Sequence, residues 1–344
     1  MPEAATNGPG HGPGFRGFFW QFDAPVTAIA WAVPDIAAFG LGDGSLALRD
    51  LAAPDRPAER FPAHADALLC LGVLKDGGLV SGGADGRLML CRRDAEPKLL
   101  AEAPRKWIEH LAISADADLI AYAVGKEAVL LQPDGTRLAM LADHPSTLSG
   151  LAFNARGKRL ATAHYNGVSL WWVKSSEQKP KRLNWRGSHV GLSWSPDSRF
   201  IMTATQENEL HGWRVEDFAD MRMSGYPSKP RAMAWSHDSK WLATAGAEVA
   251  VCWECAGKGP MGSTPVEMNA GAMVAAVAFH PRHAILASGH ADGAVILGRL
   301  GDQRSVKLEQ VGHQPIAALA WSPDGRFLMA GGEEGAAAIL DFEV

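Results

Sequence analysis

The chain has 344 residues, of which 47% are hydrophobic, and its 33 basic and 38 acidic residues give a net charge of −5 with histidine neutral. This near balance gives no reason to expect nucleic acid or membrane as a partner. Four unevenly spaced cysteines exclude a disulfide scaffold. With no secretory signal and no apolar run near the ~20 residues of a membrane span, we expect a protein of the cytoplasm.

The N-terminal segment divides into a polar tail and one short apolar run. Residues 1–16 are rich in glycine, proline and asparagine, and we expect a disordered tail there. The run Phe18–Phe22 is predicted to form a strand that stands alone near the N-terminus. Residues 17–344 are predicted to form a single domain.

A repeated pattern of short apolar segments fills the rest of the chain. Its sharpest copies are IAALAWSPDGRFLMAGG at 316–332 and VGLSWSPDSRFIMTAT at 190–205. The residues that end the first segment of each copy recur every 40 to 44 positions. A fixed period of this length, built from strands, indicates an array of one small β-unit. The column consists of Trp31, Val73, Ile113, Phe153, Trp194, Trp235, Phe279 and Trp321.

The second copy shows how one unit is organised. Three strands are predicted at Leu69–Leu74, Leu79–Gly82 and Leu88–Arg92, with a fourth at Lys98–Glu102. Asp85-Gly86 is a hairpin signal between the second and third strands. Four antiparallel strands per unit, repeated about forty residues apart, are typical of the blades of a β-propeller.

Eight first strands predict an all-β fold with eight four-stranded blades. Seven linking segments can supply seven outer strands, which leaves the last blade without one. We expect Phe18–Phe22 to fill that place, which would close the ring and remove its exposed edges. The alternative is seven blades, with the third repeat and its divergent turn Gly125-Lys126-Glu127 as an insertion.

The repeats resemble WD40 repeats, in which a His precedes the first strand, a Ser or Thr lies in the second, an Asp in the next turn, and a Trp six residues later. The resemblance covers the chain beyond residue 17, but most copies lack part of the set. The high alanine and glycine content is typical of bacterial proteins. The residues that match are His64, Ser81 and Asp85 in the second repeat, His144, Thr162, Asn166 and Trp172 in the fourth, and His313 in the eighth.

The resemblance implies that these side chains form buried hydrogen-bond chains within blades. A buried polar group needs a partner, so an incomplete set is costly unless water or backbone completes it. Because few sets are complete, we expect the domain to depend more on packed Trp, Phe, Leu and Val.

The central channel of a propeller enzyme would carry several carboxylates or histidines. The first strands of this chain are mostly small and apolar, and the ionisable residues near them are scattered: Glu109, His110, His189 and Arg231. General acid–base catalysis needs groups within hydrogen-bond reach. An enzyme of the hydrolase or lyase type is therefore the second hypothesis, and we predict no catalytic residue and no cofactor.

The pair Cys252 and Cys255 has the spacing of a metal or redox motif. A structural zinc site takes four ligands, often two such pairs, and this chain has one pair at the end of a predicted strand. Most of the twelve histidines recur with the repeat and therefore have structural explanations. We predict no metal site.

The basic run at 174–186 could bind nucleic acid, with Trp185 available for stacking. A solvated loop between strands explains it better, because nothing else in the chain extends a phosphate-binding surface. Nucleic-acid binding is the least favoured hypothesis.

The favoured hypothesis is that the propeller is a rigid disk whose loops recognise proteins or peptides. We predict a noncatalytic interaction scaffold, monomeric by itself, with one or more unidentified protein partners. In WD40 domains the usual contact surface comprises the loops that enter the first strands and the residues just before the turn Asp. That rule selects Lys106, Trp107, Tyr165, Arg186, Gln206, Lys229, Arg231 and Glu333 as partner-binding candidates.

Overall fold

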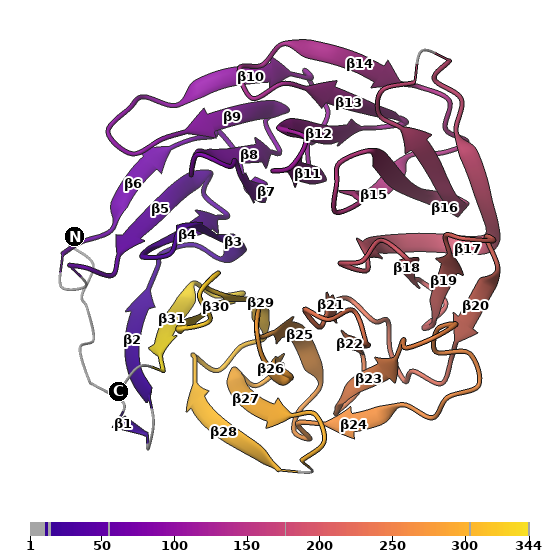
Figure 1. Ribbon diagram of the computed structural model, residues 1–344. Coiled ribbons are helices and arrows are strands. Elements are labelled where there is room, and N and C mark those ends of the chain that lie inside the picture. The colour runs from indigo at the N-terminus through magenta and orange to yellow at the C-terminus, as the bar shows by residue number, and fades with distance from the viewer. Residues whose placement is uncertain (1–10, 13–14, 54–55, 176, 303, 343–344) are drawn as a thin grey trace.

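The computed structural model describes residues 11–12, 15–53, 56–175, 177–302 and 304–342. These residues form strands, turns and bends and include no helix, so none of them belongs to a helix able to cross a membrane. The strands are arranged as a ring of sheets around a central opening, with β2 and β31 side by side (Figure 1). An all-β propeller is therefore confirmed.

Five of the sheets have four strands, one for each of the first, second, third, sixth and seventh repeats. In each, the first strand lies innermost and the fourth outermost (Figure 1). The strands are β3 (Val26–Val33), β4 (Ile36–Leu41), β5 (Ser45–Asp50) and β6 (Glu59–Pro62); β7 (Leu68–Val73), β8 (Leu79–Gly83), β9 (Arg87–Cys91) and β10 (Lys98–Glu102); β11 (Leu111–Ser114), β12 (Leu119–Val124), β13 (Glu127–Leu131) and β14 (Arg137–Leu141); β21 (Met233–Trp235), β22 (Trp241–Thr244), β23 (Ala250–Glu254) and β24 (Val266–Met268); β25 (Val274–Phe279), β26 (Ile285–His290), β27 (Ala294–Arg299) and β28 (Ser305–Gln310).

The fourth and fifth repeats share one six-stranded sheet, so the described residues form seven sheets and the prediction of eight separate four-stranded blades is wrong. The third repeat is not the cause, because β11–β14 form a regular sheet. The two repeats join because the segment between them stays hydrogen-bonded to both neighbours, bending at Gly187 with φ of 131°. The strands are β15 (Leu148–Phe153), β16 (Arg159–Trp172), β17 (Lys181–Trp194), β18 (Phe200–Thr205), β19 (Leu210–Arg214) and β20 (Asp220–Met223).

The last sheet joins the two ends of the chain. Its inner strands are β29 (Ile316–Trp321), β30 (Phe327–Gly332) and β31 (Ala336–Asp341), and β2 (Phe15–Gln21) pairs antiparallel with β31. The short β1 (His11–Gly12) pairs with the outer edge of β2. Closure by the N-terminal strand is therefore confirmed. The expected disordered tail at 1–16 mostly lies outside the described residues, but the strand already begins at Phe15.

The closing strand is anchored by aromatic packing. Trp20 and Phe22 are buried and belong to one cluster with Phe39 of β4. The ring centroid of Phe39 lies 6.5 Å from that of Trp20 and 5.4 Å from that of Phe22. Such aromatic side chains bury large apolar areas, so the N-terminal strand contributes to the core of the first repeat as well as to the last sheet.

The aromatic column predicted from the repeat period connects adjacent repeats. The indole N–H of Trp31 donates to the carbonyl of Ala320 at 3.1 Å, and that of Trp194 donates to the carbonyl of Ala152 at 3.0 Å. Trp321 makes the equivalent bond to Ala278. The bond from Trp31 crosses from the first repeat to the last, so it also stabilises the closure.

Candidate interaction face

The loops that enter the innermost strands lie at the same end of the sheets as the hairpins between second and third strands, because the strands are antiparallel. We call this end the hairpin face. Backbone hydrogen bonds connect the two loop classes, such as the bond from the amide of His64 to the carbonyl of Gly44 at 3.0 Å. Main-chain contacts therefore hold the two loop classes of the hairpin face together.

The shared sheet of the fourth and fifth repeats carries a pocket on this face. Tyr165, at the hairpin within β16, is 54% exposed, and Arg186 is exposed without a partner among the described residues. The arginine of β20 forms an ion pair of 2.6 Å with the buried carboxylate of Glu209. We call this hollow of about 750 Å³ the junction pocket; it is lined by Tyr165, Trp185, Arg186, Gly187, Glu207, Glu209 and Arg222.

A stack of rings lies beneath the junction pocket. The ring of Trp185 is stacked on that of His211, with centroids 3.9 Å apart, and Trp213 meets the same histidine edge-on at 4.8 Å. Both ring nitrogens of His211 are buried without a hydrogen bond, and Asp220 is 3.5 Å from Nε2. Burial, with smaller effects of His189 and Arg222, lowers the pKa of His211 to about 3. The histidine is therefore a neutral packing group at neutral pH.

The second repeat contains the hydrogen-bond set expected for His64, Ser81 and Asp85. Nδ1 of His64 donates to Asp85 at 3.0 Å, and Nε2 is 2.8 Å from the hydroxyl of Ser81. The other carboxylate oxygen of Asp85 accepts the amide of Ala65. Burial lowers the pKa of His64 despite the carboxylate. The three side chains fix the entering loop to the hairpin.

The fourth repeat forms a related set in which two expected residues are wrong. His144 contacts Thr162 at 2.9 Å as expected, but the indole that bonds to both belongs to Trp171. Trp172 is 53% exposed on the opposite side of the strand. Nδ1 of His144 donates to the carbonyl of Lys126, so Asn166 takes no part and instead accepts the amide of Gly187.

A shorter hairpin explains the shift to Trp171. The hydroxyl of Thr162 donates to the backbone carbonyl of Ser169, seven positions later. In the fifth repeat, the hydroxyl of Thr203 donates to the backbone carbonyl of His211, eight positions later. Because the hairpin is one residue shorter, the indole position moves one residue toward the N-terminus, from Trp172 to Trp171. Since successive side chains of a strand alternate between faces, the neighbouring tryptophan points away.

His313 is also wrong as a member of a buried set. Its side chain is exposed, and no hydrogen bond joins it to the described residues. The second strand of that repeat has Ala330 opposite Leu319, at the place where Ser81 pairs with Leu71. Because Ala330 has no hydroxyl, a buried histidine at this place would lack a hydrogen-bond partner.

The second and eighth repeats give different predictions for the effect of a substitution on the free energy of unfolding. The change Ser81→Ala leaves Nε2 of His64 buried and unpaired, so we expect a loss of about 1–3 kcal/mol in the free energy of unfolding. His313→Ala removes an exposed group and should change it by less than about 0.5 kcal/mol. Urea denaturation monitored by tryptophan fluorescence compares the two variants. Equal stabilities would contradict the assigned set.

Known proteins were compared with this sequence and fold. A family model for the WD40 domain of anaphase-promoting complex subunit 4 matches residues 270–344. Meiotic recombination protein rec14 of Schizosaccharomyces pombe is 28% identical over 194 residues, or 54% of this chain and 64% of the relative. The WD repeat-containing protein slp1 of the same yeast is 27% identical over 108 residues, or 30% of this chain and 22% of the relative. These matches support the resemblance of the chain to WD40-repeat β-propellers.

The matched part covers less than two thirds of the length of each of these WD40 relatives. A computationally designed protein, Ika8, has a similar fold, with a TM-score of 0.77 over 93% of this chain and 97% of that one. At 16% identity this likeness concerns the fold alone. None of these comparisons supports the bacterial origin suggested by composition.

The predicted partner-binding residues of this propeller lie on the hairpin face but do not form one cluster. Tyr165 and Arg186 line the junction pocket together. Nζ of Lys229 donates to Gln206 at 3.3 Å, which joins the loops of the fifth and sixth repeats. The others are separate from this group: Lys106 and Trp107 precede β11, Arg231 precedes β21, and Glu333 follows β30.

Several residues of the buried hydrogen-bond sets and of the junction pocket were not predicted. Tyr226 takes the histidine position in the sixth repeat, where its hydroxyl lies 2.7 Å from Thr244 and accepts the indole N–H of Trp253 at 2.6 Å. Its spacing of 18 residues before Thr244 equals that from His144 to Thr162, which was a usable signal. The pocket residues Glu209 and Arg222 had no such signal, since their pairing depends on strand register.

The ionisable residues expected near the channel lie in different surroundings. His189 is buried within its own sheet, with Nδ1 2.7 Å from the hydroxyl of Thr203 and Nε2 bonded to the carbonyl of Trp185. His110 is 3.8 Å from Glu109, and Arg231 is exposed. Among the described ranges, no three His, Cys, Asp or Glu residues are grouped as metal ligands.

The two cysteines of the Cys-x-x-Cys pair are free and buried. The thiol of Cys252 contacts the sulfur of Met268 at 3.9 Å, and that of Cys255 is directed at the carbonyl of Trp253. Burial raises the pKa of each thiol to about 12. In the described structure both thiols are therefore protonated at neutral pH and pack as small apolar groups.

Proposed function

We propose that this WD40 propeller is a noncatalytic scaffold that binds partner proteins or peptides through its hairpin face. The observation that carries the proposal is the junction pocket, where the exposed Tyr165 and the unpaired Arg186 lie on a rigid base of stacked rings. Tyrosine and arginine are residue types that often dominate binding at interfaces. A rigid base lowers the entropy cost of binding.

The free donors in the pocket favour a partner with acceptor groups. Both carboxylates already have internal bonds: Glu209 pairs with Arg222, and Glu207 accepts the amide of Ser188 at 3.2 Å. The guanidinium of Arg186 has no such bond within the described chain. The family model that matches residues 270–344 describes a subunit of a protein complex, which supports a role in assembly. A location in the cytoplasm stays a prediction.

Affinity capture with matched variants tests this function. We expect Tyr165→Ala and Arg186→Glu each to lose at least about 80% of the specifically captured protein, because each removes an exposed anchor. Met261→Ala and Lys75→Glu change an exposed apolar side chain and an exposed cation on the opposite face and should keep the captured protein. Quantitative mass spectrometry provides the measurement. Equal capture by all four folded variants would refute the proposed face.

A further inference from the structure

A groove lies on the face opposite the hairpin face, between the third and fourth repeats. Two adjoining hollows of about 700 and 580 Å³ share Ala117 and Lys174 among their lining residues. We call them together the opposite-face groove. The first hollow contains three leucines with Asp118 and Asp134 at its border, and the second contains three cations with Trp172 and Asp116. We call them the apolar hollow and the basic hollow.

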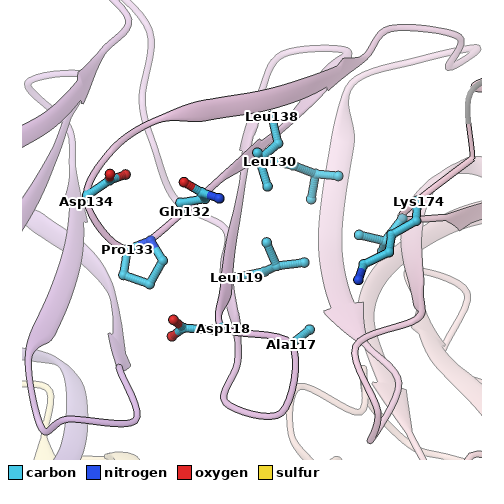
Figure 2. Close-up of a pocket in the computed structure, with 10 residues that line it drawn as sticks. Ala117, Asp118, Leu119, Leu130, Gln132, Pro133, Asp134, Leu138 and Lys174 are labelled. Atoms are coloured by element: carbon cyan, nitrogen blue, oxygen red, sulfur yellow. The ribbon is translucent and has the colours of Figure 1, made fainter.

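The apolar hollow is built from strands of the third repeat. Leu119 and Leu130 are buried in its floor, and Leu138 of the outer strand β14 is 48% exposed beside them. Figure 2 shows these leucines on the side of the hollow toward Lys174, with Asp118 and Asp134 on the other side. Exposed leucine above a buried apolar floor offers a place for one bulky apolar side chain.

The basic hollow contains three cations that form no ion pair with the described residues, and one carboxylate, Asp116, so cations outnumber carboxylates in its lining. Arg156, Lys158 and Lys174 are exposed, and no hydrogen bond or ion pair joins their side chains to the described residues. Trp172 lines the same hollow, and the guanidinium of Arg159 lies 4.2 Å from its ring centroid. A cation over the ring holds the exposed tryptophan in place.

A reversed charge in the repeat explains why two of these cations, Arg156 and Lys158, are free. The turn between first and second strands pairs Asp197 with Arg199 at 2.5 Å in the fifth repeat, and Asp238 with Lys240 at 3.2 Å in the sixth. In the fourth repeat the same turn reads Asn-Ala-Arg-Gly-Lys at 154–158. Arg156 therefore replaces the aspartate, and Lys158 loses its partner.

We propose that the opposite-face groove binds an acidic peptide segment of a partner protein, with a bulky apolar residue of that segment in the hollow beside Leu138. Carboxylates of the segment would pair with the three free cations, and such charge complementarity gives specificity and fast association. Asp118 and Asp134 border the apolar hollow, so the acidic residues of the segment would have to lie on the side of the three cations. The apolar hollow beside those cations suits a peptide side chain better than a nucleic-acid backbone.

Fluorescence anisotropy on the full chain tests this groove with a labelled peptide, Glu-Asp-Glu-Leu-Glu-Asp-Glu. We expect binding that weakens as salt rises. Arg156→Glu and Lys158→Glu should each weaken it by at least about tenfold. The same peptide with serine in place of leucine should bind about tenfold more weakly, as should Leu138→Ser with the original peptide.

The control is Lys75→Glu, which makes the same charge change at another exposed cation without a described side-chain partner. It should keep the affinity of the intact chain, and thermal melts show that every variant is folded. No binding by the intact chain, or equal weakening by Lys75→Glu, would overturn the proposal. A labelled single-stranded DNA that binds as tightly and displaces the peptide would also overturn it, in favour of nucleic acid.

Discussion

Removal of residues 1–22 should abolish the cooperative folding of the ring. The deletion takes Trp20 and Phe22 out of the core and leaves the outer edge of β31 without its six paired residues. Loss of one buried Phe or Trp side chain costs about 3–5 kcal/mol, and a whole domain is stable by only about 5–15 kcal/mol. Near-UV circular dichroism and thermal denaturation of the deletion variant should therefore show no cooperative melt.

A graded variant and a rescue make this prediction specific. Phe22→Ala alone should still fold but melt at a lower temperature, because the strand remains and only its anchor beside Phe39 is lost. Adding a peptide of residues 11–24 to the deletion variant should restore part of the melt, since the pairing with β31 is noncovalent. A deletion variant as stable as the full chain would show that β2 does not close the ring.

Acidification should destabilise the protein between about pH 6.5 and pH 4. Burial lowers the pKa of His144 to about 4 and that of His211 to about 3. The unfolded chain binds these protons near pH 6.5, so it holds more protons than the folded chain below that pH. The stability is therefore fully present above pH 6.5 and falls with pH. Burial lowers six further histidine pKa values in the same direction, those of His64, His110, His164, His189, His280 and His290.

The size of the acid effect can be assigned to single residues. At about 1.36 kcal/mol per pH unit, His211 alone should lower the free energy of unfolding by about 2–3 kcal/mol between pH 6.5 and pH 4.5. His211→Phe loses no hydrogen bond and keeps a ring beneath Trp185. Urea denaturation at both pH values should show a smaller pH dependence for this variant. An unchanged pH dependence would contradict the assignment.

The repeat period was enough to predict the ring and its closure, because each copy carries its own strand pattern. The second repeat shows this well: β10 has the predicted bounds Lys98–Glu102, and β7 and β9 differ from prediction by one residue at each end. The number of separate sheets could not be predicted in the same way. It depends on whether the segment before His189 forms a loop or continues the ladder, and hydrogen bonding to both neighbours decided this.

The polar sets were predictable where the hairpin has a standard length. His64, Ser81 and Asp85 meet as their spacing implies, whereas one missing residue moves the indole from Trp172 to Trp171. Substitution by another residue type was harder to foresee, as with Tyr226 in the histidine place. The junction pocket needed the fold itself, because its lining comes from the hairpin of one repeat and the strands of the next.

Hydrogen–deuterium exchange of the captured complex tests the central functional claim most directly. On partner binding, we expect the backbone amides of residues 184–189 and 205–209 to gain protection, because these segments line the junction pocket. The amides of the outer strands β6 and β24, away from that pocket, should exchange as in the free protein. Protection confined to the outer strands, with residues 184–189 unchanged, would contradict partner binding through the hairpin face.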